Sequence, residues 1–421
     1  MERYEHYSTV SNLLTKDVPS HWEMKRNRVF LRPKFVSVGQ DANKYPLLSL
    51  TTNGIVYRDV ESGKGKFPKD FDAYQVVAPN DIVFCLFDVD ETPRTVGLSS
   101  LNGMLTGAYD VFYIANTVNP KFIYYYYTAV DDVKALRPYY TGLRKVVKKD
   151  KFMAISIPLP SVDEQNSIVA YLDKKITLIE SCKCQREREL QTLNELKQAE
   201  IASVVTRGLN PNVPMKDSGI PWIGQIPAHW ETKRAKYMFK KEKREVRPED
   251  KVVTCFRDGQ VTLRENRRTT GFTESITEIG YQGIRKGDLV IHQMDAFAGS
   301  IGVSDSDGKG TSVYHCCTPK GAYLPEYYAL TLREMARAGF IQSLYRGIRE
   351  RSSDFNFQTF GKQYLPVPPE NEQLEIVNYI HSRTAKIDKM IAALNDEIDR
   401  LVEYKQRLIS DVVTGQINVQ D

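Results

Sequence analysis

The C-terminal part of the chain repeats apolar residues at a spacing of seven. No Pro or Gly interrupts the sequence between Pro369 and Gly415, and a second apolar seam lies between the members of the first. This is the a/d pattern of a long helix that packs along another helix. The predicted core positions of this helix are Ile380, Ile387, Leu394, Leu401 and Leu408 in one seam, with Ile391, Ile398 and Val412 in the other.

An earlier stretch, between Pro160 and Gly208, also lacks Pro and Gly and keeps part of this pattern, although Lys183 and Arg186 interrupt it. About 43 helical residues span roughly 65 Å, which exceeds the diameter of a domain of about 140 residues. We therefore predict that the two helices pair as an antiparallel coiled coil; the alternative is that each packs on its own globular domain. The predicted core positions of the earlier helix are Leu172, Ile176, Ile179, Leu190, Leu193 and Val204.

Short β-prone runs, separated by Gly, Pro and Asn, precede each long helix. This pattern predicts a mixed-sheet α+β domain before each helix, with short helices around Tyr124–Tyr127 and 325–338 packed on the sheets. The runs are Val76–Val77, Ile82–Phe87, 110–115, 251–256 and Asp288–His292.

The chain is one unit used twice. Residues 18–26 return as 226–234 around His-Trp-Glu, and residues 157–210 return without a gap as 365–418, both at an offset of 208. Similarity between these anchors is faint but collinear. The repeat predicts an α+β protein with a pseudo-twofold internal repeat and four segments: a domain at 1–157, a helix at 158–210, a domain at 211–365 and a helix at 366–421. Trp22 and Trp230 occupy the same position in the matching segments 18–26 and 226–234, and both are predicted core anchors.

Composition narrows the class of protein without deciding it. The 421 residues carry 58 Lys+Arg against 53 Asp+Glu, a net charge of +5, which permits a nucleic-acid partner without requiring one. The six cysteines lack metal-binding spacing, so we expect reduced structural thiols. No apolar run approaches the length of a membrane span, so we expect an intracellular protein without membrane contact.

The motifs of a self-contained active site are missing. The segment 302–310 differs from a phosphate-binding loop in its glycine spacing and in Gly310, which stands where that loop has a hydroxyl residue. Asp88, Asp90 and Glu91 offer carboxylates to a metal, but their place before Thr-Pro favours a solvated turn. We predict neither catalytic nor metal-binding residues.

These motifs resemble one family, the specificity subunits of type I restriction–modification enzymes. The resemblance rests on Ile-Pro-Ala-His-Trp at 226–230, Leu-Pro-Ser-Val-Asp-Glu-Gln at 159–165, the lead-in at 216–224 and the duplicated order of these motifs. The chain departs from the family at 11–16, where the usual Gly-Ile-x-Trp-Ile-Gly is missing, which puts the docking of the N-terminal segment in doubt.

The resemblance implies a prokaryotic, cytoplasmic protein without catalysis of its own. Each mixed-sheet domain would be a target recognition domain that reads one half of a bipartite, asymmetric double-stranded DNA site, and the helices would set the spacing. Two adenine-N6 methyltransferase subunits and two motor–nuclease subunits are the implied partners. We expect S-adenosylmethionine, ATP and Mg²⁺ on those partners and no cofactor on this chain.

Basic and amide side chains in loops are the candidates for DNA contact, because phosphates attract cations and base edges bind Arg, Asn and Gln. The alternative for each basic run is a solvated face. The candidates are Arg144, Lys145, Lys148 and Lys149, with Arg346, Arg349 and Arg351 at the equivalent place, and, for base reading, Thr51, Thr52, Asn53, Arg257, Gln260, Arg264, Asn266, Arg267 and Arg268.

A different class of function remains open from the sequence: a duplicated, non-catalytic scaffold that binds proteins through its two domains. Binding to DNA should weaken steeply with salt, which separates the two classes.

Overall fold

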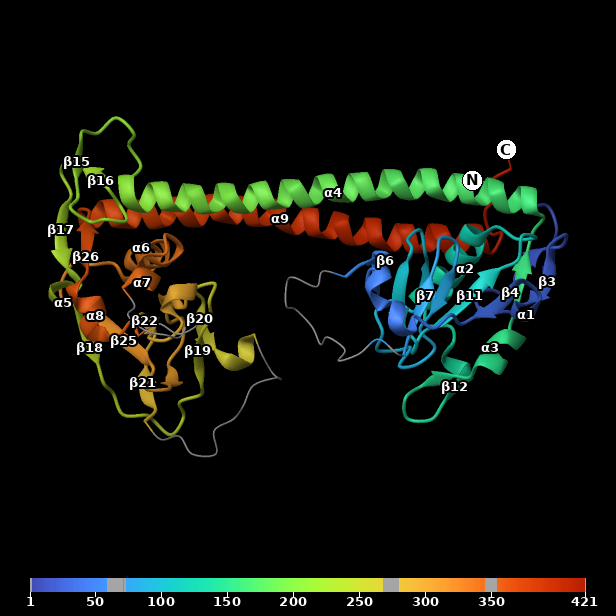
Figure 1. Ribbon diagram of the computed structural model, residues 1–421. Helices are drawn as coiled ribbons and strands as arrows, with labels where there is room; N and C mark the ends of the chain where they lie inside the picture. Colours follow the sequence, from blue (N-terminus) through green and yellow to red (C-terminus); the bar gives the residue numbers. More distant parts are fainter. Residues whose placement is uncertain (1, 59–70, 72, 268–279, 345–353, 421) are drawn as a thin grey trace. The chain divides into compact units, whose positions relative to one another are not determined.

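The computed structural model describes residues 2–58, 71, 73–267, 280–344 and 354–420, which form two compact units. The first unit consists of Met1–Glu187 and Asn395–Asp421, and the second of Arg188–Leu394 (Figure 1). Each unit therefore combines a sheet-rich part with a portion of both long helices. The finer division at residues 157, 210 and 365 stays a prediction.

Besides its portions of the long helices, the described part of the first unit contains short strands, two short 3₁₀ helices and three short α-helices. The strands are β1 (Tyr7–Thr9), β2 (Asp17–Pro19), β3 (Glu23–Arg26), β4 (Leu31–Lys34), β5 (Leu48–Thr51), β6 (Gly54–Tyr57), β7 (Tyr74–Val77), β8 (Ile82–Phe84), β9 (Val96–Leu98), β10 (Gly103–Thr106), β11 (Asp110–Ile114), β12 (Tyr140–Thr141), β13 (Val146–Val147) and β14 (Ser156–Leu159). The helices are α1 (Asn27–Phe30), η1 (Gly39–Lys44), α2 (Pro120–Asp132), η2 (Arg137–Tyr139) and α3 (Lys149–Ala154).

The second unit repeats this order with local changes. Its strands are β15 (Met215–Asp217), β16 (Gln225–Pro227), β17 (Glu231–Arg234), β18 (Phe239–Glu242), β19 (Val253–Cys255), β20 (Val261–Leu263), β21 (Gln282–Ile284), β22 (Leu289–His292), β23 (Ile301–Val303), β24 (Gly308–Gly310), β25 (Tyr314–Pro319) and β26 (Tyr364–Val367). Its helices are α5 (Ala235–Met238), η3 (Arg264–Asn266), η4 (Ala296–Ala298), α6 (Pro325–Arg337), α7 (Phe340–Ser343) and α8 (Phe357–Lys362).

Both units are built on the same four-stranded sheet. The strand order is β4-β11-β8-β9 in the first unit and β18-β25-β22-β23 in the second. The ladders in these sheets are antiparallel, whereas isolated bridges such as Leu47 with Met104 and Val252 with Lys309 are parallel. The predicted α+β fold with its internal repeat is therefore confirmed.

One helix of thirteen residues covers each sheet. In the first unit Asn119 caps α2 by accepting hydrogen bonds from the backbone N–H groups of Lys121 and Phe122, and Pro120 occupies the first turn. The tyrosines Tyr125, Tyr126 and Tyr127 of this helix are buried, so the helix predicted around Tyr124–Tyr127 packs on the sheet. In the second unit α6 also begins with Pro, and the helix predicted at 325–338 is confirmed.

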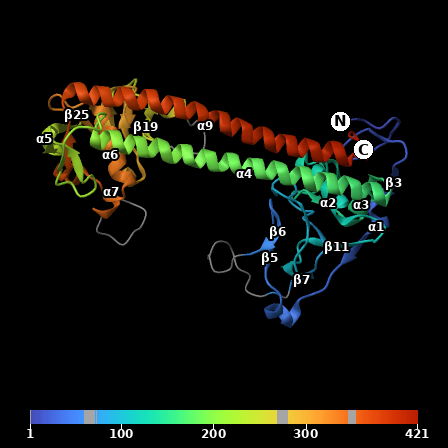
Figure 2. The ribbon, with the colours of Figure 1, turned by 90° about the horizontal axis from the view of Figure 1, so that it is seen from above.

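The two Pro-free and Gly-free stretches form the long helices α4 (Val162–Arg207) and α9 (Glu370–Val413). Within each unit the two helices lie side by side (Figure 2). In the first unit Glu180 pairs with Lys405 at 2.6 Å and Arg186 with Glu397 at 3.0 Å. Because residue numbers rise along one helix as they fall along the other, the pairing in this unit is antiparallel, as predicted.

The second unit has the same antiparallel arrangement. Lys197 of α4 pairs with Asp388 of α9 at 2.5 Å, and Glu200 pairs with Arg383 at 2.8 Å. Across both units all fourteen predicted core positions of the helices are buried or half-buried. The buried ones are Leu172, Ile179, Val204, Ile380, Ile387, Leu408 and Val412, and the half-buried ones are Ile176, Leu190, Leu193, Ile391, Ile398, Leu394 and Leu401.

In each unit a hydrogen bond between a repeated tryptophan and a repeated glutamate joins the start of one long helix to the sheet-rich part. In the first unit Trp22 is buried, and its Nε1 donates to the carboxylate of Glu164 at 3.0 Å, in the first turn of α4. In the second unit Trp230 donates in the same way to Glu372 of α9 at 3.0 Å. Both tryptophans are thus core anchors, and the motif ties helix and sheet together by a hydrogen bond.

The six cysteines are free thiols, and Cys85, Cys255, Cys316 and Cys317 are buried. Burial raises the pKa of each of these four thiols, to about 12 for Cys316, so they stay protonated at neutral pH. Among the helices described, none combines the length and the apolar character required to cross a membrane.

Candidate nucleic-acid interface

The first predicted base-reading segment is the turn of the hairpin between β5 and β6. The hydroxyl of Thr51 donates to the Gly54 carbonyl at 3.0 Å and accepts from the backbone N–H of Asn53 at 3.1 Å. These bonds fix the turn and occupy Thr51, while Thr52 and Asn53 are exposed. Gly54 has φ of +89°, which a side chain disfavours. Thr52 and Asn53 therefore remain the side chains of this turn that are open to a ligand.

The basic run of the first unit lies at the hairpin between β12 and β13, beside an acidic loop. Arg144 pairs with Asp88 at 3.2 Å, and Lys145 lies 3.4 Å from Asp90 and 3.4 Å from Glu91. The hydrogen bonds to these carboxylates raise the pKa of Lys145. The three acidic residues weighed as metal ligands thus contact cations instead, which accords with a solvated turn.

These ion pairs leave Arg144 and Lys145 able to bind another anion. The side chain of Arg144 is 72% exposed, and ion pairs at such exposure contribute about 0–1 kcal/mol. A phosphate group can therefore replace the carboxylate at small cost. Both cations can therefore exchange these carboxylates for another anion.

Lys148 and Lys149 follow at the start of α3. Lys149 pairs with Asp110 at 3.0 Å and lies over the Phe112 ring at 5.3 Å. Lys148 is exposed, and within the described part of the chain it makes neither an ion pair nor a side-chain hydrogen bond. No hydrogen bond or ion pair between described residues joins this basic group to the Thr51–Asn53 turn.

The second unit gathers most of its predicted base-reading residues on one hairpin, between β19 and β20. Arg257 and Gln260 lie in its turn, and Arg257 pairs with Asp295 at 3.2 Å. Arg267, after β20, pairs with Asp258 of the turn at 2.7 Å and lies 4.3 Å from the centre of the Phe256 ring.

Arg264 and Asn266 lie on the η3 turn of the same hairpin. The Nε of Arg264 donates to the hydroxyl of Thr254 at 3.4 Å, and the amide of Asn266 donates to the hydroxyl of Thr262 at 2.8 Å. Both side chains therefore brace the hairpin, Arg264 from a half-buried position and Asn266 from an exposed one. The remaining candidates, Arg268, Arg346, Arg349 and Arg351, lie outside the described residues.

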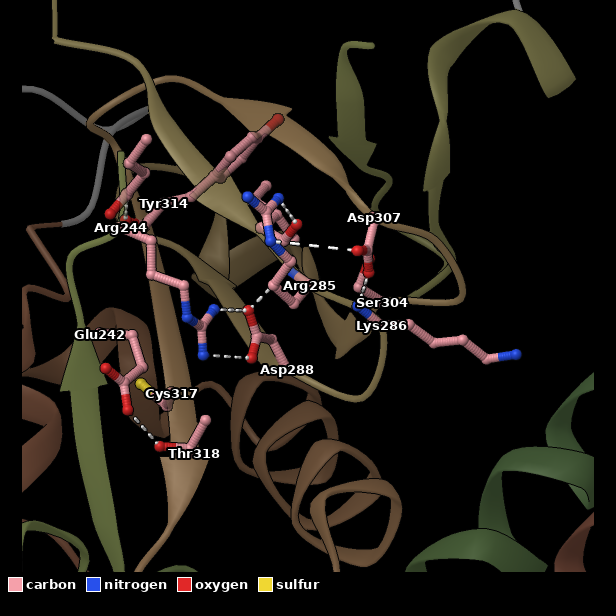
Figure 3. A network of polar contacts seen from close by, with 12 residues as sticks. Glu242, Arg244, Arg285, Lys286, Asp288, Ser304, Asp307, Tyr314, Cys317 and Thr318 are labelled. Atoms are coloured by element: carbon pink, nitrogen blue, oxygen red, sulfur yellow. Dashed lines mark hydrogen bonds and ion pairs between the residues drawn. The ribbon is translucent and has the colours of Figure 1, made fainter. Parts of the chain in front are cut away.

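A network of arginines and carboxylates, absent from the sequence-based candidates, holds the loops at the ends of β21, β22 and β24 (Figure 3). Arg244 directs both of its Nη atoms at Asp288, with Nη2 3.1 Å from Oδ1. Arg285 pairs with Asp250 at 3.1 Å. Forked, charge-assisted pairs of this kind fix both partners in orientation as well as in position.

Lys286 extends from this network with an exposed side chain (Figure 3). Its backbone N–H donates to Asp307 at 2.9 Å, whereas its ammonium group has neither an ion pair nor a hydrogen bond with another described residue. Lys286 is thus a further cation available to a phosphate.

The first unit has a simpler network at the same place, where Lys34 pairs with the buried carboxylate of Asp81. Asp81 and Asp288 each precede the central strand of their sheet, in the faint repeat Asn-Asp-Ile-Val and Gly-Asp-Leu-Val. That repeat is the sequence signal from which the equivalence of these two aspartates could have been predicted. Their cationic partners, Lys34 at the end of β4 and Arg244 just after β18, are distant in sequence and carry no local signal.

Comparisons with known proteins agree with this architecture. Residues 40–192 match the family model described as type I restriction modification DNA specificity domain. The chain is 21% identical over 283 residues to the type I restriction enzyme EcoBI specificity subunit of Escherichia coli, a match that spans 63% of this chain and 59% of that subunit.

Two solved structures share the fold. A chain from a structure of complex assembly and conformational transition in the type I R-M system has a TM-score of 0.65 and 15% identity, with 95% of this chain and 99% of that chain covered. The HsdS subunit from Thermoanaerobacter tengcongensis has a TM-score of 0.51 and 16% identity, with 95% and 98% covered. The resemblance drawn from the sequence motifs is confirmed: residues 40–192 are similar to the type I restriction modification DNA specificity domain, and the chain shares its fold with the HsdS subunit.

Proposed function

We propose that this chain is the DNA-specificity subunit of a type I restriction–modification enzyme and that each unit reads one half of a bipartite double-stranded DNA site. The observation that carries the proposal is the duplicated frame with different side chains on its hairpin turns. The turn of the first unit offers Thr52 and Asn53, and the equivalent turn of the second offers Arg257 and Gln260. Different side chains on one backbone frame suit two half-sites of different sequence.

The cations around these turns provide the affinity. Arg144, Lys148 and Lys286 are exposed, so DNA phosphates can approach them. The ion pairs with nearby carboxylates keep the net charge of each unit low, which limits non-specific attraction of the free protein to nucleic acid.

The paired helices set the distance between the two half-sites and offer a surface to partner proteins. Antiparallel ion pairs such as Glu180 with Lys405 and Lys197 with Asp388 fix the register of the two helices. A longer or shorter pair of helices would therefore change the spacing between the half-sites and leave their sequences unaltered.

Catalysis belongs to the partners in this proposal. Two adenine-N6 methyltransferase subunits dock on the helices and bring S-adenosylmethionine, and two motor–nuclease subunits bring ATP and Mg²⁺. This chain then supplies specificity alone and binds none of these cofactors itself.

Methylome sequencing of cells with and without the gene tests the proposal. A bipartite adenine motif should be methylated only when the gene is present. Gln260→Ala should relax one half of the motif, and the matched variant Asn53→Ala the other half, each by about 1–3 kcal/mol of discrimination between bases. A methylome that does not depend on the gene would contradict the proposal, as would variants that alter both halves alike.

A duplicated protein-binding scaffold is the second candidate, because the exposed ion pairs also suit a protein surface. Salt separates the two. Binding of the assembled complex to DNA should fall by orders of magnitude between about 50 and 200 mM salt, as phosphate contacts release counterions. A complex without salt-dependent DNA binding would favour the scaffold.

A further inference from the structure

The second unit contains a cavity of about 400 Å³ between α4, α6 and the turn that follows β19. Its apolar wall includes Ile201, Phe297 and Leu330. Four cationic side chains and two carboxylates also line it, which leaves an excess of positive charge. The charged residues are Lys197, Arg257, Arg333 and Arg337, with Asp258 and Glu334.

Three of these cations already have a carboxylate partner. Lys197 binds Asp388 of α9, Arg257 binds Asp295, and Arg337 binds Glu334 one turn earlier on α6. Asp258 lies in the cavity wall, but its carboxylate pairs with Arg267, outside the cavity lining. Both carboxylates that line the cavity are therefore engaged by arginines other than Arg333.

Within the described residues Arg333 is the lining cation without an ion pair or a hydrogen bond, and its Nε is buried. Burial lowers the pKa of Arg333, because desolvation disfavours the charged form. The carboxylate of Asp258 acts on Arg333 only through a longer-range attraction, which raises its pKa in opposition to burial. An unpaired guanidinium in such a position is costly, and an anion that enters the cavity would remove that cost.

The backbone of the neighbouring turn is shaped around this guanidinium. Gly259 has φ of +90°, and a Cβ at that position would lie 2.3 Å from Nη1 of Arg333. Gly299, which also lines the cavity, has φ of +90° as well, and a Cβ there would lie 2.8 Å from the backbone carbonyl oxygen of Arg257. Gly259 thus leaves room for the guanidinium of Arg333, and Gly299 leaves room for the backbone of the turn that carries Arg257.

The equivalent place in the first unit is filled by an internal carboxylate, Asp131 of α2. Its side chain is buried and accepts from the backbone N–H of Thr95 at 3.1 Å, from the Thr95 hydroxyl at 2.6 Å, from Arg94 at 3.2 Å and from Lys134 at 2.7 Å. Arg94 also pairs with Asp132 at 2.9 Å. An anion surrounded by donors therefore belongs to the frame at this position.

The second unit has lost that anion and the two cations that bind it, whereas Ser300 keeps a hydroxyl at the place of Thr95. The residues before α2 and α6 make the same hydrogen bond, which aligns the two helices residue by residue. The backbone N–H of Asn119 donates to Gln165, and that of Leu324 donates to Gln373, both at 2.8 Å. In this alignment Ala336 replaces Asp131. The replacements at the other places are Gly299 for Arg94, Gly339 for Lys134 and Arg337 for Asp132.

We propose that this cavity binds a small organic monocarboxylate, whose carboxylate pairs with Arg333 while its apolar stem lies against Ile201, Phe297 and Leu330. A planar carboxylate matches the guanidinium fork, and a single negative charge matches Arg333, the one lining cation that has no ion pair with another described residue. A phosphate dianion or a DNA backbone would bring more negative charge next to Asp258 and Glu334. The group can come from a free acid or from a glutamate side chain of a bound protein.

Calorimetric titration of the full chain tests this, with phenylacetate as the probe and phenylacetamide as its neutral analogue. Phenylacetate should bind with one-to-one stoichiometry, and phenylacetamide about tenfold more weakly or not at all, because the amide lacks the charge. Arg333→Gln should weaken phenylacetate binding about tenfold. The matched control Arg337→Gln removes a charge from the same cavity that is already paired, so it should change the affinity by less than about threefold.

A second variant restores the anion of the first unit. Ala336→Asp places a carboxylate three residues after Arg333 on α6, where the two side chains can pair. This variant should raise the melting temperature by about 2 °C and abolish phenylacetate binding. Retained binding in Ala336→Asp would overturn the proposal, and so would equal affinity for the acid and the amide, or an equal loss in Arg333→Gln and Arg337→Gln.

Two further probes identify the source of the carboxylate. Tighter binding of N-acetyl-glutamic acid α-amide than of phenylacetate supports a protein side chain, and the reverse order supports a free acid. If inorganic phosphate binds more tightly than either and a short DNA duplex displaces phenylacetate, the cavity is a phosphate contact and the carboxylate assignment is wrong. Direct binding is measured without DNA, so its failure is distinct from failure of the proposed function.

Discussion

The two glutamates that receive the tryptophan hydrogen bonds should contribute unequally to stability. Glu164 and Glu372 are each the third residue of a long helix, so any interaction with the helix N-terminus is similar for both. Their surroundings differ, since the side chain of Glu164 is 2% exposed and that of Glu372 is 19% exposed. Replacement by Ala at the two positions is therefore a matched comparison of burial and bonding.

The expected difference in the free energy of unfolding follows from the hydrogen-bond donors that each glutamate satisfies. Glu164 accepts from Trp22 at 3.0 Å, from the hydroxyl of Tyr4 at 2.6 Å and from His21 at 3.0 Å. The side chain of His21 is 53% exposed and can bind water instead, so Glu164→Ala leaves the donors of Trp22 and Tyr4 without a partner. At about 1–3 kcal/mol for each unsatisfied donor, the free energy of unfolding should fall by about 3–4 kcal/mol.

Glu372 accepts from Trp230 at 3.0 Å and from His229 at 2.9 Å, in a more exposed setting. Glu372→Ala leaves one indole donor without its partner, and water can reach the site, so the loss should be about 1–2 kcal/mol.

Urea unfolding followed by circular dichroism measures these losses, and hydrogen exchange at the first turns of α4 and α9 shows which unit each variant affects. If Glu372→Ala lowers the free energy of unfolding as much as Glu164→Ala does, burial and the Tyr4 hydrogen bond do not govern the strength of the joint, and the reasoning is refuted.

Three further predictions concern the helix pair and the second unit. Leu394→Asp puts a charge at a half-buried position of the helix pair, so it should loosen the pair and abolish co-purification with methyltransferase subunits; normal co-purification would contradict this. Burial lowers the pKa of His315 to about 4, below its ordinary value of about 6.5, so unfolding takes up a proton as the pH falls. Stability should be complete above pH 6.5 and fall by up to about 3 kcal/mol by pH 4, and thermal melts of His315→Phe should lack this loss. Gly259→Ala should cost about 1–3 kcal/mol in urea unfolding, more than Gly287→Ala, which has a similar φ but open space at its Cβ.

The sequence predicted those parts of the fold that depend on local pattern. The absence of Pro and Gly, together with the seven-residue spacing, predicted α4 and α9, and the repeated His-Trp and Glu-Gln motifs marked the joint between Trp22 and Glu164. Such features depend on a helical periodicity or on a short sequence motif, and both can be recognised in a single sequence. The antiparallel pair was favoured because one chain carries two such seams and because each helix is longer than the diameter of its neighbouring domain.

Contacts between distant segments could not be predicted in this way. Arg94 and Asp131 are 37 residues apart, and the offset between the units changes from 208 at the anchors to 205 at α2 and α6. The match of Asp131 to Ala336 rests on the hydrogen bonds from Asn119 to Gln165 and from Leu324 to Gln373, so the loss of the buried anion in the second unit was not predicted from the sequence. The same holds for Arg244 and Asp288, whose pairing depends on which strands are neighbours.

The placement of charge explains how the two units can diverge without loss of the common fold. The tryptophan–glutamate joint is present in both units, whereas the ion pairs around the exposed turns, such as Arg144 with Asp88 and Arg257 with Asp295, lie within one unit each. A substitution in one turn therefore disturbs only its own carboxylate partners, at a cost of about 0–1 kcal/mol when the pair is exposed. Because the stability of the frame rests on the buried joint and the helix pair, the turns of one unit can change their side chains, and with them the proposed half-site, while the other unit keeps its own.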